Sequence, residues 1–322
     1  MNRYARQMIL PEIGQAGQDR LRDARVLVVG AGGLGCPALQ YLVGAGVGQI
    51  TIIDPDHVEE TNLHRQPLFK MSDLGTPKAE AAAAHLQAAN PDVHLRAFVA
   101  SLNPGNASDL VRNSDVVVDA ADSFAVSYIL SDTCQDLGVP FVSASALGFT
   151  GYVGAFCATA PSLRAVFPDL PSRSATCASV GVLGPVVGTI GAIQAQITLQ
   201  ILLKLDPSPL GQMTRIDLQN LRFGGFDFRS APEPETQIPF ISTSAITASD
   251  QVVELRDMSE FSDKIAPQAQ RIDVADIDRF QPEQDRRVVL VCATGLRAWR
   301  AANMLIQANH TNLALLAARA NS

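Results

Sequence analysis

Residues 26–54 constrain the fold of this chain more than any other stretch of its sequence. Residues 26–29 (V-L-V-V) are typical of a strand buried on both faces, and the glycines of residues 30–35 (G-A-G-G-L-G) let the backbone turn sharply and approach a phosphate. We expect a helix over residues 34–46, whose free N–H groups and dipole attract anions. A second strand ends at Asp54, where a carboxylate is well placed to bind ribose hydroxyls. The pattern therefore predicts a nucleotide site near the start of the chain.

Strand and helix patterns alternate after this site. We expect helices over residues 79–89 and 125–137, and strands over residues 94–100, 115–119 (D-V-V-V-D) and 140–144. This alternation predicts an α/β fold with a Rossmann-like, doubly wound, mostly parallel sheet. Residues 148–157, where apolar residues alternate with glycine, and the hairpin-like residues 215–228 predict an antiparallel extension of that sheet.

A proline-punctuated run at residues 230–239 (S-A-P-E-P-E-T-Q-I-P) predicts a domain boundary. We divide the chain into a first domain at 1–229, a linker at 230–249 and a compact second domain at 250–322. Residues 252–257 and 288–292 are predicted parallel strands, and a helix is expected over residues 298–309. The second domain is therefore expected to be a small α/β unit.

The composition favours a folded protein of the cytoplasm. Charged residues make up 18% of the chain and hydrophobic residues 47%, so a sizeable core can form. A net charge of −7 and a pI of about 5.2 do not favour nucleic acid or an anionic membrane surface as a partner. The five scattered cysteines are odd in number and indicate free thiols in a reducing compartment, and the first residues show no signal-peptide pattern.

Residues 180–203 carry no charge and meet the length rule for a membrane helix. They also contain several glycines, a proline and three glutamines, which suit a helix buried in a protein core or a subunit interface better. We therefore expect no membrane span.

Residues 1 to about 228 resemble the ThiF/MoeB family, the bacterial relatives of ubiquitin-activating enzymes. The matching pieces, in chain order, are R-Y-A-R-Q at 3–7, G-A-G-G-L-G at 30–35, D-P-D-x-V-x-x-T-N-L-H-R-Q at 54–66, G-T-P-K at 75–78, D-A-A-D at 119–122, A-T-C-A-S-V-G-V-L-G-P at 175–185 and G-x-I-G-A-I-Q-A at 188–195. Residues 143–151 (S-A-S-A-L-G-F-T-G) look more like the ThiF side of the family.

The resemblance implies an ATP-dependent adenylyltransferase. Such enzymes join AMP to the C-terminal Gly-Gly carboxylate of a ubiquitin-like sulfur-carrier protein, release pyrophosphate and so prepare the carboxylate to become a thiocarboxylate. It favours thiamine biosynthesis, with the molybdopterin pathway as the alternative. Because this attack brings anions together, catalysis must rest on positioning and cationic stabilisation. The glycine pattern alone would favour an NAD(P)-dependent oxidoreductase, and a non-catalytic carrier-binding protein also stays open.

The resemblance also implies roles for individual residues. The ATP-binding set consists of the turn glycines and the side chains around the ribose and phosphates: Gly30, Gly32, Gly33, Gly35, Asp54, Asp56, Asn62, Arg65, Lys78 and Asp122. Asp122 would hold Mg²⁺, although the family usually has Asn where Ser123 follows it. Arg6 would reach the phosphates of a neighbouring subunit, which requires a homodimer. The plainer alternatives are a strand-end cap for Asp54, surface charges for Arg65 and Lys78, and a surface salt bridge for Arg6.

Cys177 matches a family cysteine that can join the activated carrier through sulfur, and an inert loop thiol is the alternative. Cys36, Cys134 and Cys157 lie among apolar residues and are expected to pack in the core. Most relatives bind a structural zinc through two C-x-x-C pairs. The corresponding residues 162–167 and 228–232 contain no cysteine, so we predict no zinc site and expect apolar packing there, by Val166 and Phe167.

Residues 250–322 resemble a short rhodanese-like domain that lacks its closing helix. The segment C-A-T-G-L-R-A at 292–298 looks like the active loop, whose backbone N–H groups would stabilise a thiolate or persulfide on Cys292. Arg297 would orient this loop. The resemblance implies that Cys292 accepts sulfur from a cysteine desulfurase and passes it to the adenylated carrier, and an inactive docking module is the alternative.

Overall fold

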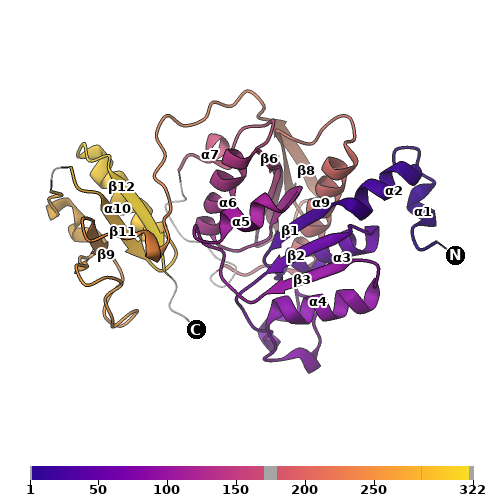
Figure 1. Ribbon diagram of the computed structural model, residues 1–322, viewed down its shortest axis with the longest axis horizontal. Helices are drawn as coiled ribbons and strands as arrows, with labels where there is room; N and C mark the ends of the chain where they lie inside the picture. Colours follow the sequence, from indigo (N-terminus) through magenta and orange to yellow (C-terminus); the bar gives the residue numbers. More distant parts are fainter. Residues whose placement is uncertain (1, 170–179, 284, 319–322) are drawn as a thin grey trace.

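The computed structural model describes residues 2–169, 180–283 and 285–318 (Figure 1). An eight-stranded sheet forms its larger part. In spatial order the strands are β3 (His94–Phe98), β2 (Gln49–Ile53), β1 (Arg25–Val29), β4 (Val116–Asp119), β5 (Phe141–Leu147), β6 (Thr150–Phe156), β7 (Gln212–Asp217) and β8 (Arg222–Asp227). The strands from β3 to β5 are parallel and those from β5 to β8 antiparallel, which confirms the predicted fold class.

Helices cover both faces of the parallel strands because alternate side chains of each strand point to opposite faces. On β1, Val26 and Val28 pack with α3 (Gly35–Ala45) and α4 (Lys78–Ala89), whereas Leu27 and Val29 pack with α5 (Ala107–Arg112) and α6 (Phe124–Leu137). The described residues of this part also form α1 (Ala5–Met8), α2 (Gly14–Asp23), η1 (Glu60–Asn62), η2 (Met71–Asp73), α7 (Leu163–Val166) and a long apolar helix. The carboxyl ends of the central strands thus open at one edge, as ligand sites in such sheets require.

The long apolar helix is α9 (Gly184–Leu203), and it begins four residues later than the uncharged stretch, with Pro185 in its first turn. It is long and apolar enough by composition to cross a membrane, but half of it is buried within the described chain. It packs on α3 and on β4, β5 and β6, where Val187 lies against Gly33 and Ile190 against Gly151. In this structure α9 is a core helix beside the glycine turn.

A second sheet of four parallel strands follows, with the order β10 (Gln270–Arg271), β9 (Gln251–Glu254), β11 (Val288–Cys292), β12 (Leu313–Ala317). The helix α10 (Leu296–Gln307) starts directly after β11, and η3 (Thr243–Ala245) and η4 (Val274–Arg279) complete the unit. The predicted parallel pairing of residues 252–257 with 288–292 is confirmed. Figure 1 shows this small sheet on the side of the molecule where α6 and α7 lie.

Part of the predicted linker belongs structurally to this second sheet. Leu315 of β12 donates its N–H to Pro239 O at 2.9 Å, and Ile241 donates to Leu315 O at 2.8 Å. Ile238 and Phe240 are buried, because an extended apolar segment at a sheet edge gains both backbone hydrogen bonds and apolar contacts. The linker between the two sheets is therefore shorter than the predicted linker at residues 230–249.

Candidate active site

The glycine turn lies where β1 ends, and the segment after β4 crosses it. Gly30 has a φ of +98°, and a Cβ there would come within 2.6 Å of the carbonyl oxygen of Ala120. A Cβ on Gly35 would collide with the carbonyl oxygen of Gly30. Only glycine permits both the backbone conformation and this contact, so the sequence forms a tight turn that leads into the N-terminus of α3.

Asp54 joins the end of β2 to this turn. Its Oδ2 accepts the N–H of Ala31 at 2.7 Å and its Oδ1 accepts the N–H of Asp56 at 2.8 Å. Burial raises the pKa of Asp54, against these two hydrogen bonds and the nearby charge of Lys78, which lower it. The strand-end cap that we considered is therefore present. Each carboxylate oxygen retains a second acceptor site, so the cap and a ribose contact are compatible.

Lys78 brings a buried positive charge to the same place. Its side chain is 7% exposed, and Nζ donates to Oδ2 of Asp56 at 3.0 Å. Its backbone N–H also donates to Asp56 O at 2.8 Å, which places the ammonium at the start of α4. The interpretation of Lys78 as a solvated surface charge is wrong, because its side chain is buried away from water.

Asn62, Arg65 and Gln66 form a connected group beside the turn. Arg65 Nη2 donates to Oδ1 of Asn62 at 2.8 Å, and the Gln66 amide lies near the same oxygen at 3.5 Å. A Cβ on Gly32 would lie 3.7 Å from Nε2 of Gln66. The Oε1 atom of Gln66 is buried and has no hydrogen-bond partner within the described part of the chain, which is rare for a buried polar atom.

Sequence reasoning did not select Gln66 as a site residue, although it ends the matched run at 54–66. Its position next to Gly32 and Asn62 places it in the candidate site. The signal is the buried amide oxygen with no described hydrogen-bond partner, because a glutamine in a loop is ordinary by composition.

Asp119 and Asp122 have opposite environments in the segment that crosses the turn. Asp119 ends β4 fully buried, and it accepts hydrogen bonds from Ser143 Oγ at 2.8 Å and from the N–H of Ala121 at 3.2 Å. Burial raises the pKa of Asp119 to about 6, against the hydrogen bonds from Ser127, Ser143 and Ala121, which lower it. Asp122 is exposed just before α6. Its carboxylate can therefore reach a ligand at the carboxyl edge of the sheet.

Arg6 does not share this site within one chain. It lies exposed on α1, whose neighbour Tyr4 packs against Gly46 at the C-terminal end of α3. The glycine turn is at the opposite end of α3, which is 11 residues and hence about 16 Å long. Figure 1 shows α1 at the outer end of the molecule. Arg6 is therefore not part of the nucleotide site of its own chain.

The four cysteines that the structure describes are all buried. Cys36, Cys134 and Cys157 are fully buried, as predicted, and burial raises the pKa of Cys36 and of Cys157 to about 12. Cys177 lies outside the described residues. Cys292 ends β11, and its Sγ accepts the N–H of Gly295 at 3.1 Å and of Ala298 at 3.4 Å, at the N-terminus of α10. Arg297 points to Glu260, which it holds through two hydrogen bonds of 2.7 and 2.6 Å.

A carboxylate joins the two segments where zinc ligands were expected in relatives. Glu233 accepts the backbone N–H of Ser162 at 2.6 Å and its hydroxyl at 2.5 Å. Phe167 stacks on Tyr152, and Phe228 packs on Phe156. The expected apolar packing by Phe167 is confirmed. The Ser162–Glu233 link is an addition that the sequence did not indicate.

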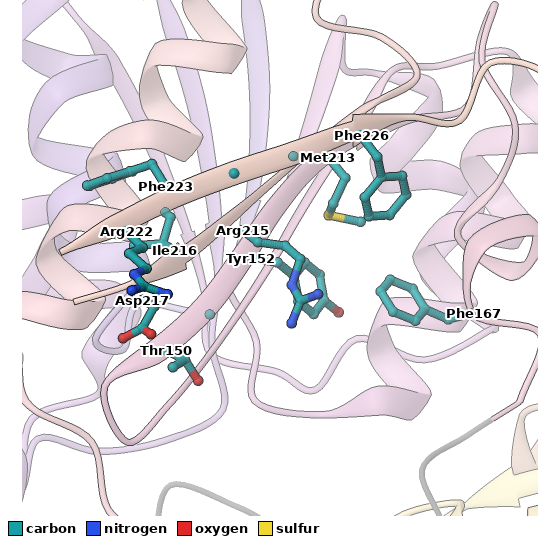
Figure 2. Close-up of a pocket in the computed structure, with 13 residues that line it drawn as sticks. Thr150, Tyr152, Phe167, Met213, Arg215, Ile216, Asp217, Arg222, Phe223 and Phe226 are labelled. Carbon is teal, nitrogen blue, oxygen red and sulfur yellow. The ribbon is translucent and has the colours of Figure 1, made fainter. Parts of the chain in front are cut away.

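A cavity of about 740 Å³ lies over the antiparallel strands. Figure 2 shows Thr150, Asp217 and Arg222 at one end, Tyr152 and Arg215 in the middle, and Phe226, Met213 and Phe167 at the other end. Phe223 and Phe226 on the edge strand β8 are 61% and 47% exposed. Phe226 lies on the cavity face of the sheet with the two arginines, whereas Phe223, three residues earlier on the same strand, points to the opposite face. An exposed aromatic side chain beside two arginines is typical of a site for protein contact.

The fold and this site define a nucleotide-binding α/β protein with its ligand edge at the carboxyl ends of the parallel strands. The family model described as the ThiF family matches residues 4–239, and the chain therefore belongs to the ThiF family. The match ends before the second sheet.

Two relatives match most of their own length. The SAMP-activating enzyme E1 of Haloferax volcanii is 40% identical over 235 residues, which cover 72% of this chain and 87% of that protein. The sulfur carrier protein adenylyltransferase of Thermus thermophilus is 40% identical over 240 residues, which cover 72% and 89%. The adenylyltransferase and sulfurtransferase MOCS3 of Drosophila grimshawi is 42% identical over 232 residues, but the match spans only 52% of that longer protein.

Solved structures agree on the fold. Escherichia coli MccB with ATP superposes with a TM-score of 0.61 at 22% identity over 71% of each chain. MccB alone gives a TM-score of 0.63 at 23% identity over 71% of this chain and 70% of that one. With its family and relatives, the chain is an enzyme of the adenylyltransferase class, and the NAD(P)-dependent oxidoreductase and the non-catalytic binding protein are excluded.

Proposed function

We propose that this enzyme uses ATP to adenylate the C-terminal Gly-Gly carboxylate of a ubiquitin-like sulfur-carrier protein. The observation that carries the proposal is the gathering of Lys78, Arg65 and Asn62 beside the glycine turn and Asp54. The printed names of the Thermus thermophilus and Haloferax volcanii relatives support this class of substrate.

In the reaction, a carboxylate oxygen of the carrier attacks the α-phosphorus of ATP, and the bond from that phosphorus to pyrophosphate breaks. Attacking and leaving groups are both anionic, so positive charge held in a low-dielectric site stabilises the transition state. Lys78 and Arg65 supply this charge, Asn62 orients Arg65, and the turn lets backbone N–H groups approach the phosphates. Asp56, now paired with Lys78, completes the ATP-binding set.

The exposed carboxylate of Asp122 fits a magnesium ion, because Mg²⁺ prefers carboxylate oxygens together with substrate phosphates. The ion would neutralise phosphate charge there. Asp54 would hold the ribose through its remaining acceptor sites.

We propose a homodimer in which Arg6 reaches the partner's phosphates. Its distance from the glycine turn of its own chain supports this arrangement, as do the exposed side chains of Ile9 and Leu10 beside it, at 70% and 52% exposed. An apolar surface next to an exposed arginine suits a contact between copies.

The carrier is proposed to dock over the cavity on β6–β8, where Phe226 lies exposed beside Arg215 and Arg222 (Figure 2). The ThiF-like run at 143–151 supports thiamine biosynthesis as the pathway, with molybdopterin synthesis as the alternative. The acidic net charge of −7 and the free thiols support a cytoplasmic enzyme without nucleic-acid or membrane partners.

We also propose that the second unit is rhodanese-like and transfers sulfur. The Cys292 thiolate attacks the terminal sulfur of a desulfurase persulfide, whose own thiolate leaves. The terminal sulfur of the Cys292 persulfide then attacks the carbonyl carbon of the carrier adenylate and AMP leaves. A second thiol attacks the Cys292 sulfur, which releases the thiocarboxylate and leaves a disulfide. The N–H groups of Gly295 and Ala298, which donate to Sγ, support this role for the loop.

Exchange of labelled pyrophosphate into ATP tests the adenylation. We expect exchange only when ATP, Mg²⁺ and a carrier ending in Gly-Gly are all present. A carrier that lacks its last glycine is the matched control. Exchange that does not depend on the carrier would overturn the proposed substrate, and thiamine-type and molybdopterin-type carriers compared side by side would identify the pathway.

A further inference from the structure

The sulfur atom of Cys292 is enclosed in this structure. The residue is 0% exposed, although the loop that follows it supplies N–H groups as a reactive thiol requires. A sulfur donor is a protein, and it cannot reach an atom that even water does not contact. The second unit must therefore rearrange before Cys292 can react.

The cysteine loop contacts both the Phe240 ring, which packs with the second sheet, and α6 of the larger unit. Gly295, whose N–H donates to Sγ, has a φ of +84°, and a Cβ there would lie 3.3 Å from Cβ of Ala125 and 2.9 Å from the ring of Phe240. Ala125 is in the first turn of α6, directly after Asp122 and Ser123. The cysteine loop is thus pressed against the helix that begins at the adenylation site.

Three side chains hold this contact together. The Trp299 ring of α10 lies 6.1 Å from the Tyr128 ring of α6, and the Arg164 guanidinium lies 4.7 Å from the Tyr128 centroid and 5.8 Å from that of Trp299. A cation over aromatic faces is attracted by the ring quadrupoles, most strongly when it is desolvated, and Arg164 is 1% exposed. We call Trp299, Tyr128 and Arg164 the aromatic latch.

Two members of the aromatic latch are fixed within the larger unit, whereas the third is not. Arg164 is held by both oxygens of Asp132 at 2.6 and 2.8 Å, and Tyr128 donates its hydroxyl hydrogen to Phe167 O at 2.5 Å. The indole N–H of Trp299 is buried without a hydrogen-bond partner among the residues that the structure describes. When the contact opens, the indole N–H of Trp299 can donate a hydrogen bond to water. This gain reduces the free-energy difference that favours the closed state.

We propose that the aromatic latch switches Cys292 between two states: closed, with the thiol hidden against α6, and open, with the thiol accessible to its sulfur donor. The role of this switch in sulfur loading rests on the proposed sulfurtransferase function. The burial of the Cys292 thiol in the closed state does not depend on that function. We expect adenylation to proceed equally in both states, because the side chains of the phosphate site lie on other elements.

A disulfide can hold the closed state at a distance from Cys292. A Cβ on Gly105, in the loop before α5, would lie 3.6 Å from Cβ of Ser242, which precedes η3, and disulfides span about 3.5–4.5 Å between Cβ atoms. The variant Gly105→Cys/Ser242→Cys, oxidised, is the locked form. The two single variants in the same buffer are its controls.

Two substitutions open the aromatic latch. Trp299→Ala acts from the small unit, and Tyr128→Leu removes the facing ring from the larger unit without touching α10. Met304→Ala, at a 39% exposed position of the same helix, is the matched control. Circular dichroism and the urea midpoint establish that each variant is folded, and the full chain is used throughout.

The measurement is the rate at which iodoacetamide alkylates Cys292, read from its peptide by mass spectrometry. We expect Trp299→Ala and Tyr128→Leu to raise the rate at least 10-fold, and the locked form to lower it at least 10-fold against the single variants. Carrier-dependent pyrophosphate exchange should stay unchanged in all of them. Equal alkylation rates in locked and single variants, or wild-type rates in both opened variants, would overturn the proposal.

Sulfur loading is measured on the same proteins with a persulfide-bearing cysteine desulfurase. Loading that follows the alkylation rate supports the complete proposal. If Cys292 alkylates as expected but accepts no sulfur in any variant, the aromatic latch stands and the sulfurtransferase role fails.

Discussion

Lys78 donates a hydrogen bond from Nζ to Oδ2 of Asp56 at 3.0 Å, and the lysine side chain is 7% exposed whereas the aspartate side chain is 55% exposed. A buried ammonium is unfavourable unless it is paired, and a partner that faces solvent can move away easily. Phosphate oxygens can therefore take the place of Asp56 beside Lys78. This relationship makes Lys78 the strongest single candidate for contact with ATP.

We expect Lys78→Ala and Arg65→Ala each to reduce carrier-dependent pyrophosphate exchange about 100-fold or more, as removal of one transition-state contact typically does. The exposed Lys264 and Arg112 provide matched controls as Lys264→Ala and Arg112→Ala, which should exchange at the wild-type rate. Exchange within about threefold of wild type in Lys78→Ala would remove this residue from the site.

Gln66 offers a test of the buried amide that sequence reasoning missed. Gln66→Glu places a negative charge beside the phosphates at nearly constant volume, and we expect the KM for ATP to rise about 10-fold or more because like charges repel at short range. Gln66→Met keeps the volume without the charge and should have the smaller effect. The same KM in Gln66→Glu as in the wild type would place Gln66 away from the nucleotide.

The raised pKa of Asp119 predicts a pH dependence of stability. Between its ordinary pKa of 3.8 and the folded-state pKa of about 6, the folded protein binds a proton that the unfolded chain has released, so this group's contribution to stability falls as pH rises from about 4 to 6. The loss amounts to about 3 kcal/mol, at about 1.4 kcal/mol per unit. Asp119→Asn lacks this ionisation.

We therefore expect Asp119→Asn to gain stability relative to wild type on going from pH 4.5 to pH 7.5, measured by urea unfolding at several pH values. Asp109→Asn, at an exposed position, is the control and should follow the wild-type curve. Parallel curves for Asp119→Asn and wild type would show that the Asp119 pKa is not raised.

The Ser162–Glu233 link predicts a local effect on stability. Glu233→Ala removes two charge-assisted hydrogen bonds and should lower the free energy of unfolding by about 2 kcal/mol, whereas Ser162→Ala removes one and should lower it by about 1 kcal/mol. Glu235→Ala, in the same exposed segment, is the control. No change in Glu233→Ala would contradict a structural role for this carboxylate.

The missing cysteine pairs predict that the purified protein carries no zinc. Elemental analysis should find less than about one tenth of an equivalent, and a chelator should leave the unfolding temperature unchanged. Stoichiometric zinc, or a chelator that lowers the unfolding temperature, would refute this prediction.

Cys292→Ala separates the two proposed activities. We expect it to abolish sulfur transfer to the carrier and leave pyrophosphate exchange intact, because the Cys292 loop supplies no phosphate ligand. Cys134→Ala, a buried core thiol, is the control and should transfer sulfur normally when folded. Persulfide found on another residue, with transfer intact in Cys292→Ala, would reduce the second unit to a docking role.

The sequence by itself determined the class of fold and most of the nucleotide site. Glycine spacing, the apolar run before it and the acidic residue after the second strand are local requirements, so Gly30 and Asp54 could be selected without coordinates, whereas Lys78 was selected through the family resemblance. The alternation of elements likewise predicted both sheets, since strand and helix periodicities are local properties of the chain.

Tertiary structure alone decided how distant segments meet. Three features involve residues whose local sequence patterns do not identify one another. They are the buried amide oxygen of Gln66, the link from Ser162 to Glu233 and the contact of Trp299 with Tyr128. It also decided that Lys78 is buried, that Arg6 lies far from its own glycine turn and that Cys292 is enclosed. The burial of a side chain and the residues that it contacts depend on how the complete chain packs, so no local sequence pattern predicts them.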